Sequence, residues 1–185
     1  MVYTTLTPQL GEIRLAWWRE RLQDLDRGIG PPAEPRLQAV AETLIPVGIT
    51  GGELSRLEDC WLVLLNPFPW GGAEADAIAE RGAILFGAGA RLLGQEAEEA
   101  KRLGEIWSLA HAAKGVSDAA SREVLCHRAK SAIANLPDKP IPSGLKPLAM
   151  IAARRTYDLM HDRRSKWHRV FWALRYGMTD KFPRS

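Results

Sequence analysis

Apolar residues recur along the whole chain at the three- and four-residue spacing of amphipathic α-helices. Segments rich in glycine and proline separate these periods, and no stretch of useful length alternates in the manner of a β-strand. The pattern therefore predicts an all-α protein with helices packed antiparallel across short connections. These helices are expected over residues 8–26, 35–44, 53–65, 73–93, 96–114, 117–136 and 148–176, with a linker over 137–147.

The first predicted helix carries two adjacent tryptophans, which point about a third of a turn apart. Thr7 and Pro8 supply an N-cap and a first-turn proline for this helix. Its apolar residues form two neighbouring stripes, Leu10, Ile13 and Trp17 in one and Trp18, Leu22 and Leu25 in the other. Either the helix is covered on two sides, or one tryptophan faces something other than the core.

The chain of 185 residues fits a single domain over 1–185, and its 46% hydrophobic and 25% charged content is ordinary for a soluble globular protein. No stretch reaches the roughly 18 uncharged apolar residues that span a bilayer. The N-terminal residues lack the basic and apolar pattern of a signal peptide. Cys60 and Cys126 form no CxxC pair, which favours reduced thiols. We therefore expect a cytoplasmic protein.

The positive charge gathers at the C-terminus, where the last 32 residues hold nine Lys or Arg against three Asp. This composition predicts a basic, aromatic C-terminal helix over about 154–178, with Trp167, Phe171 and Leu174 on one side. Such a helix suits the anionic inner face of a membrane, and the alternative is a solvated basic helix. Nucleic acid is disfavoured as a partner because the aromatic residues are spaced for apolar burial and no nucleic-acid-binding module is present.

Metal ligands are sparse in the sequence. The four histidines show no ligand spacing, so a structural zinc site is not expected. Asp158 and Asp162 lie four residues apart and could share a Mg²⁺ ion that bridges a diphosphate. The favoured interpretation is that they pair instead with neighbouring cations, namely Arg154, Arg155 and Lys166.

The segment GEIRLAWWR, residues 11–19, resembles the start of a helix in the squalene/phytoene synthase family, a branch of the all-α isoprenoid synthases. The resemblance continues through RLEDCWL, ERGAILFGAGARLLG, LGEIWSLAHA and LPDKPIPSGLKPLAMIA, and so covers about residues 10–153. It implies a single antiparallel bundle of the isoprenoid synthase type that lacks the N-terminal helices. In such a bundle the first helix is covered on two sides, so both tryptophans can be buried.

Active members of that family hold two aspartate-rich motifs, which bind Mg²⁺ and the diphosphates of two prenyl substrates. The first would precede residue 11, where the helix that carries it is expected to be missing. The second would follow residues 103–112, where Asp118 is the only acid of the segment AKGVSDAAS. Because ionisation of an allylic diphosphate needs metal ions to stabilise the leaving group, the resemblance implies a catalytically degenerate member with no certain cofactor.

Several functions stay open at this point. The first hypothesis is a pseudoenzyme that binds an isoprenoid diphosphate, another lipid or a protein partner. The second is an active farnesyl or geranylgeranyl transferase, which would need Mg²⁺ and a helix supplied from upstream or from another chain. The third is a membrane-surface or assembly-factor module, because the family also includes a mitochondrial assembly factor for respiratory complex I. A bundle short of one helix would expose apolar surface, which predicts a homodimer.

The candidate ligand-binding residues come from the segments that match the family, namely Arg14, Trp18, Gly82 and Trp107. Arg14 and Arg19 could face a central cavity and attract a diphosphate. The alternative is that both arginines pair with nearby acids such as Glu12 and Asp24. All the candidates except Arg14 are equally explicable as core or helix packing.

Overall fold

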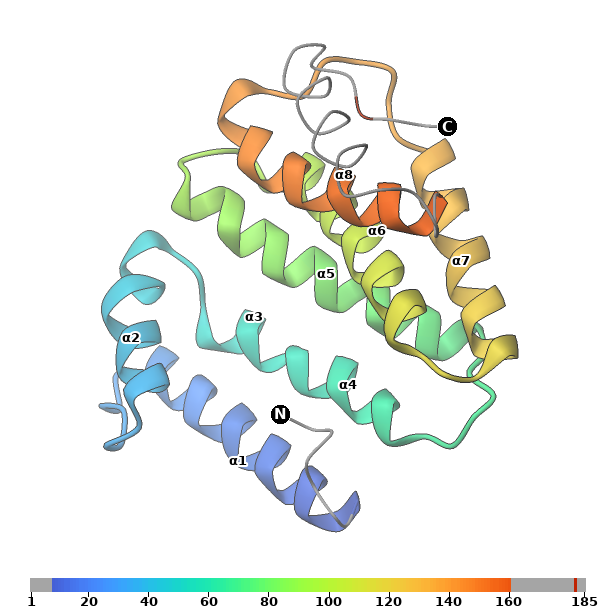
Figure 1. Ribbon diagram of the computed structural model, residues 1–185. Helices are drawn as coiled ribbons and strands as arrows, with labels where there is room; N and C mark the ends of the chain where they lie inside the picture. Colours follow the sequence, from blue (N-terminus) through green and yellow to red (C-terminus); the bar gives the residue numbers. More distant parts are fainter. Residues whose placement is uncertain (1–7, 161–181, 183–185) are drawn as a thin grey trace. The chain divides into compact units, whose positions relative to one another are not determined.

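The computed structural model describes residues 8–160 and Phe182, and every regular element in this part of the chain is helical (Figure 1). The prediction of an all-α protein is confirmed for these residues. The α-helices are α1 (Pro8–Asp26), α2 (Pro35–Thr43), α3 (Gly51–Ser55), α4 (Leu57–Leu62), α5 (Gly72–Leu92), α6 (Ala97–Gly115), α7 (Ala119–Ala134) and α8 (Lys146–Met160). Short 3₁₀ turns are η2 (Ile45–Val47), η3 (Val63–Leu65) and η4 (Ser143–Leu145).

The chain divides into two compact units, Met1–Pro67 and Phe68–Ser185. The first unit contains α1 to α4, and the second contains α5 to α8. The single domain and the isoprenoid synthase type of bundle stay predictions. None of the described helices is long and apolar enough to cross a membrane.

In the first unit, α1 lies against α3 so closely that their backbones touch. A Cβ added to Gly51 would lie 1.8 Å from the Leu22 carbonyl oxygen, so only glycine fits at this point. The Asp26 carboxylate accepts hydrogen bonds from the backbone N–H groups of Gly51 and Gly52, at 2.6 and 2.7 Å. The end of α1 therefore caps the start of α3 and ties these two helix ends together.

The helix predicted over residues 53–65 is interrupted, and the prediction of one continuous helix is wrong. The Thr50 hydroxyl accepts a hydrogen bond from the Glu53 N–H at 3.0 Å, so α3 already begins at Gly51. The Ser55 hydroxyl donates to the Gly52 carbonyl at 2.8 Å, a contact that bends helices. The chain turns at Arg56, and α4 and η3 follow as separate short pieces.

The expectation that both tryptophans of α1 are buried is also wrong. The stripe of Trp18, Leu22 and Leu25 faces inward, with Leu22 and Leu25 buried and Trp18 half-buried. Trp17 is 39% exposed, and Leu10 and Ile13 of the same stripe are exposed as well. The Trp17 ring packs edge-on against Trp18, with ring centroids 5.4 Å apart at 88°. The two stripes therefore differ in burial.

In the second unit, α5 and α6 are closely packed antiparallel neighbours (Figure 1). Gly82 lies opposite Gly104, and a Cβ added to either glycine would lie about 2 Å from the other's carbonyl oxygen, at 1.9 and 2.1 Å. Further along the same two helices, Gly87 of α5 lies opposite the side chain of Lys101 of α6. The small residues of α5 thus allow a close approach of α6.

The core of the second unit is completed by α7, α8 and one residue near the C-terminus. Leu103 and Ile106 of α6 belong to one buried cluster with Ile133, Leu145 and Phe182. The helix predicted over 148–176 begins slightly earlier, at Lys146, with Pro147 in its first turn. Thr7 and the part of the predicted C-terminal helix beyond residue 160, including Asp162, Trp167 and Phe171, lie outside the described residues.

Candidate functional site

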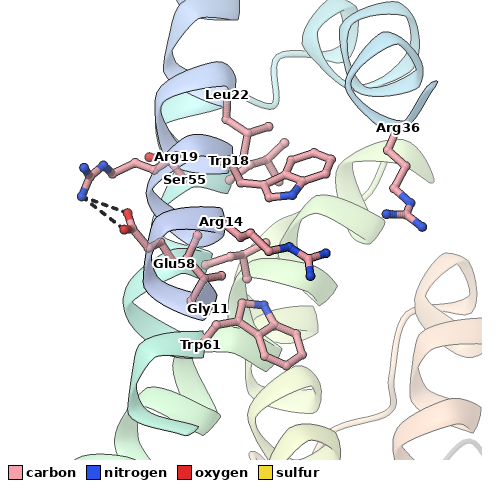
Figure 2. A pocket seen from close by; sticks show the side chains of 12 residues that line it. Gly11, Arg14, Trp18, Arg19, Leu22, Arg36, Ser55, Glu58 and Trp61 are labelled. Carbon is pink, nitrogen blue, oxygen red and sulfur yellow. Dashed lines mark hydrogen bonds and ion pairs between the residues drawn. The ribbon is translucent and has the colours of Figure 1, made fainter. Parts of the chain in front are cut away.

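The first unit contains a cavity of about 340 Å³, and two of the four predicted ligand-binding residues, Arg14 and Trp18, line it (Figure 2). Its apolar lining consists of leucine and tryptophan side chains: Leu15, Trp18, Leu22, Leu54, Leu57 and Trp61. Its charged lining consists of Arg14, Arg19, Arg36 and Glu58. We call this cavity the α1 pocket. An apolar cavity of this size with a few charged groups is typical of a small-molecule site.

One face of α1 supplies the largest part of the α1 pocket. Gly11, Arg14, Trp18 and Leu22 follow one another at intervals of three or four residues, so they lie on the same side of the helix. The opposite wall comes from α3 and α4, which the Asp26 cap holds against α1. The pocket therefore depends on how the backbones of α1 and α3 meet.

Arg14 extends from α1 on the same side as the indole rings of Trp18 and Trp61 (Figure 2). Its side chain is exposed, and within residues 8–160 it makes no hydrogen bond or ion pair. The alternative in which Arg14 pairs with Glu12 is therefore not observed in the described part of the chain. A guanidinium beside apolar surface can offer its donor fork to a carboxylate or a phosphate.

Arg19 has a different role from Arg14. Its guanidinium lies 3.0 Å from the Glu58 carboxylate, and the pair joins α1 to α4 (Figure 2). Glu58 is only 6% exposed, so its charge is balanced mainly by Arg19. Asp24, which the sequence suggested as a partner of Arg19, pairs instead with Arg21 at 2.7 Å and with Arg27.

Arg36 and Trp61 line the pocket although the sequence did not single them out. Arg36 lies in the first turn of α2, where Glu34 caps the helix by accepting a hydrogen bond from the Leu37 N–H at 2.9 Å. Trp61 has the helical spacing of an ordinary core residue. No local sequence signal connects either residue to Arg14, because both reach the pocket through the packing of separate helices.

The other two predicted site residues, Gly82 and Trp107, lie in the second unit. Gly82 is at the close crossing of α5 and α6, where its missing side chain makes room for Gly104. Trp107 packs on Phe86 with centroids 5.4 Å apart, and it stacks on His111 at 5.5 Å and 14°. Gly82 and Trp107 thus take part in helix packing within the second unit.

The weak candidate metal ligand Asp158 lies on α8 beside two cations. Its carboxylate is 3.3 Å from the Lys114 ammonium and 3.7 Å from the Arg155 guanidinium. The expected pairing with Arg155 is confirmed, and Lys114 is an additional partner. Within the part of the chain that the structure describes, no three His, Cys, Asp or Glu side chains gather as metal ligands.

Asp118, the only acid where the second aspartate-rich motif would lie, caps α7. Its carboxylate accepts hydrogen bonds from the hydroxyl and the backbone N–H of Ser121, at 2.6 and 2.7 Å. These two bonds lower the pKa of Asp118. The Asp118 side chain therefore stabilises the N-terminus of a helix.

Charged side chains of α5, α6 and α8 lie near His111 of α6. Arg81 is buried and donates to the Ser108 hydroxyl at 3.0 Å. Burial lowers the pKa of His111, and the nearby charges of Arg155, Arg81 and Lys114 lower it further. At neutral pH His111 is therefore a neutral ring stacked on Trp107.

No family model matches this chain, and neither a curated protein nor a solved structure shows significant similarity to it. The resemblance to the squalene/phytoene synthase family therefore stays a prediction based on the residues themselves. The geometry of the α1 pocket suits an amphiphile whose anionic end meets Arg14 and whose apolar part lies against the leucine and tryptophan lining.

Proposed function

We propose that this protein is a squalene/phytoene synthase-like bundle of the isoprenoid synthase type that binds an isoprenoid diphosphate or a related anionic lipid and has lost prenyl transfer. The observation that carries the proposal is that Arg14 and Trp18 line one pocket. Both belong to GEIRLAWWR, the segment with the most specific resemblance to that family.

The lining of the α1 pocket supports an amphiphilic ligand. Burial of an apolar chain against leucine and tryptophan side chains contributes about 25 cal/mol for each Å² removed from water. The Arg14 guanidinium can form charge-assisted hydrogen bonds to phosphate oxygens. The two parts of the pocket thus match the two parts of an isoprenoid diphosphate.

The described carboxylates support the loss of prenyl transfer. Among the described residues, Glu58 is the only carboxylate that lines the α1 pocket, and it is paired with Arg19. Asp118 caps α7, and Asp158 is paired with Lys114 and Arg155. These residues do not fit the paired carboxylates that hold Mg²⁺ against a diphosphate.

The test is the thermal unfolding of the full chain with farnesyl or geranylgeranyl diphosphate, in Mg²⁺ and in chelator. A ligand that binds the folded form alone raises the melting temperature. We expect a rise that Arg14→Gln reduces and that Arg102→Gln, an exposed substitution on α6, leaves unchanged. A rise that occurs only with Mg²⁺, together with product formation, would favour the active transferase. No rise at saturating ligand would contradict the proposal.

One observation favours the membrane-surface alternative as a second candidate. On α8, Met150 and Ile151 are 46% and 48% exposed beside the exposed Arg154. Exposed apolar residues next to arginine suit an anionic lipid surface. The test is sedimentation with vesicles that contain phosphatidylserine, in which the double variant Met150→Ser/Ile151→Ser should bind less. Equal binding of this variant and of the original chain would exclude α8 as the contact.

The homodimer also stays a prediction, and the exposed stripe of Leu10, Ile13 and Trp17 on α1 supports it. Light scattering after size exclusion should give twice the chain mass. A monomer at all accessible concentrations would contradict the dimer.

A further inference from the structure

We propose that the α1 pocket recognises a single carboxylate on an apolar chain, through the guanidinium group of Arg14 and without a metal ion. The inference rests on the proposed function, because it concerns the same pocket. It narrows the anionic lipid to one that carries a single negative charge, and it names the side chain that binds this charge.

The first argument is that most polar side chains of the pocket already have partners. The Arg19 guanidinium lies 3.0 Å from the Glu58 carboxylate, so these two charges balance each other. The Ser55 hydroxyl donates to the Gly52 carbonyl at 2.8 Å and accepts from the Gln23 amide at 3.3 Å. These side chains therefore offer little to the headgroup of a ligand.

The guanidinium group of Arg14 differs from the other cations that line the pocket. Arg36 and Trp61 take part in other interactions, and Arg19 is paired with Glu58. Within residues 8–160, Arg14 makes no hydrogen bond or ion pair. The donor fork of Arg14 is therefore available to a ligand.

The second argument is the match between one guanidinium and one carboxylate. A carboxylate carries one negative charge and two oxygens, which a single arginine fork binds with two parallel hydrogen bonds. A diphosphate carries more negative charge and more oxygens. The surplus would stay unpaired beside leucine side chains, which costs free energy. The donors available in the α1 pocket therefore favour the carboxylate.

The third argument is the row of side chains that runs along α1 from the charge to the core. Arg14, Trp18 and Leu22 follow one another at intervals of four residues, so they are neighbours on one face of the helix (Figure 2). Arg14 is exposed, Trp18 is half-buried and Leu22 is only 9% exposed. A carboxylate at Arg14 would keep its contact with water, while its chain would lie along Trp18 toward the buried leucines.

The experiment is a calorimetric titration of the full chain with farnesoate, farnesol and farnesyl diphosphate, which share one apolar chain and differ in the headgroup. All three are titrated in chelator. We expect farnesoate to bind about tenfold more tightly than farnesol, because only the carboxylate offers a charged acceptor to Arg14. Farnesyl diphosphate should bind less tightly than farnesoate, and Mg²⁺ should leave the binding of farnesoate unchanged.

Variants of Arg14 test which side chain binds the charge. Arg14→Gln should reduce the affinity for farnesoate to that for farnesol, and it should leave the binding of farnesol unchanged. Arg14→Lys keeps the charge but loses the fork, so its affinity for farnesoate should lie between the two. Arg102→Gln on the second unit is the matched control and should change nothing. Unfolding curves of each variant check that it folds.

The other outcomes would overturn the inference in distinguishable ways. Farnesyl diphosphate that binds more tightly than farnesoate, with or without Mg²⁺, would overturn the carboxylate and leave the proposed function intact. Farnesol that binds as tightly as farnesoate, or farnesoate binding that is unchanged in Arg14→Gln, would show that Arg14 does not recognise the headgroup. No binding of either farnesoate or farnesyl diphosphate would overturn both this inference and the proposed function.

Discussion

The Arg19 guanidinium on α1 lies 3.0 Å from the buried carboxylate of Glu58 on α4. The two residues lie 39 positions apart in the sequence. Arg19 is 45% exposed and Glu58 only 6%, so the charge that is costly to leave unpaired is the carboxylate. This ion pair joins the two walls of the α1 pocket.

Removal of Arg19 should therefore destabilise the first unit. We expect Arg19→Met to lower the free energy of unfolding by about 1–3 kcal/mol, because Glu58 would stay buried without its partner. The double variant Arg19→Met/Glu58→Leu should lose less free energy of unfolding than Arg19→Met alone. Arg14→Met on the same helix is the control and should stay within about 0.5 kcal/mol. Urea unfolding measures all four chains, and equal losses in Arg19→Met and Arg14→Met would show that the pair contributes nothing.

A substitution at Gly82 tests whether this residue is needed for the packing of α5 against α6. We expect Gly82→Ala to lower the free energy of unfolding by about 3 kcal/mol, because its Cβ would lie 1.9 Å from the Gly104 carbonyl oxygen. Gly72→Ala in the same helix has open space around it and should be neutral or stabilise by up to about 0.5 kcal/mol. Chemical unfolding of the two variants gives the comparison. A Gly82→Ala chain as stable as the original would mean that α5 and α6 can move apart at no cost.

Asp26 is expected to be the main cap of α3. Asp26→Ala should lower the free energy of unfolding by about 1–2 kcal/mol, because two backbone N–H groups at the start of α3 would lose their acceptor. Glu42→Ala, an exposed acid on α2, serves as the matched control. Asp26→Ala should also weaken ligand binding in the α1 pocket, since α3 forms part of the wall of this pocket. Intact stability in Asp26→Ala would show that Thr50 alone suffices as a cap.

His111 should make stability depend on pH. Its pKa in the folded chain lies below the ordinary value of 6.5 because of burial and the charges of Arg155, Arg81 and Lys114. The unfolded chain therefore binds the proton more readily, and stability should fall as the pH drops from about 7 through the folded pKa. The free energy of unfolding is measured as a function of pH for the wild type and for His111→Gln. The difference between the two slopes isolates the contribution of His111, because the other groups titrate in both chains. Nuclear magnetic resonance of the ring protons measures the pKa directly, and a value above 6.5 would contradict the prediction.

The helices could be predicted to within a few residues where their signals are local. Pro35, Pro67 and Pro147 mark helix starts or ends because proline has no N–H donor and restricts its neighbours. The interruption at Arg56 was missed because it depends on how Ser55 and Thr50 bond to the backbone. Periodicity alone does not contain this information.

The candidate site was predicted in part. Arg14 and Trp18 were found because they stand in one unusual segment of the sequence. Arg36 and Trp61 were not predicted as site residues, because each lines the pocket from a different helix. Gly82 and Trp107 were grouped with Arg14 by resemblance, whereas the structure places them in the packing of α5 and α6.

The sequence by itself determined the helical class and the order of the helices, because these follow from the spacing of apolar residues within one segment. Only the tertiary structure decided that Glu58 neutralises Arg19, that Trp17 is exposed while Leu22 is buried, and that Arg14 and Arg36 line the same cavity. The physical reason is that burial and charge pairing depend on which helix covers which face. That choice is made by contacts such as the one between Gly51 and Leu22, which lie 29 residues apart in the sequence.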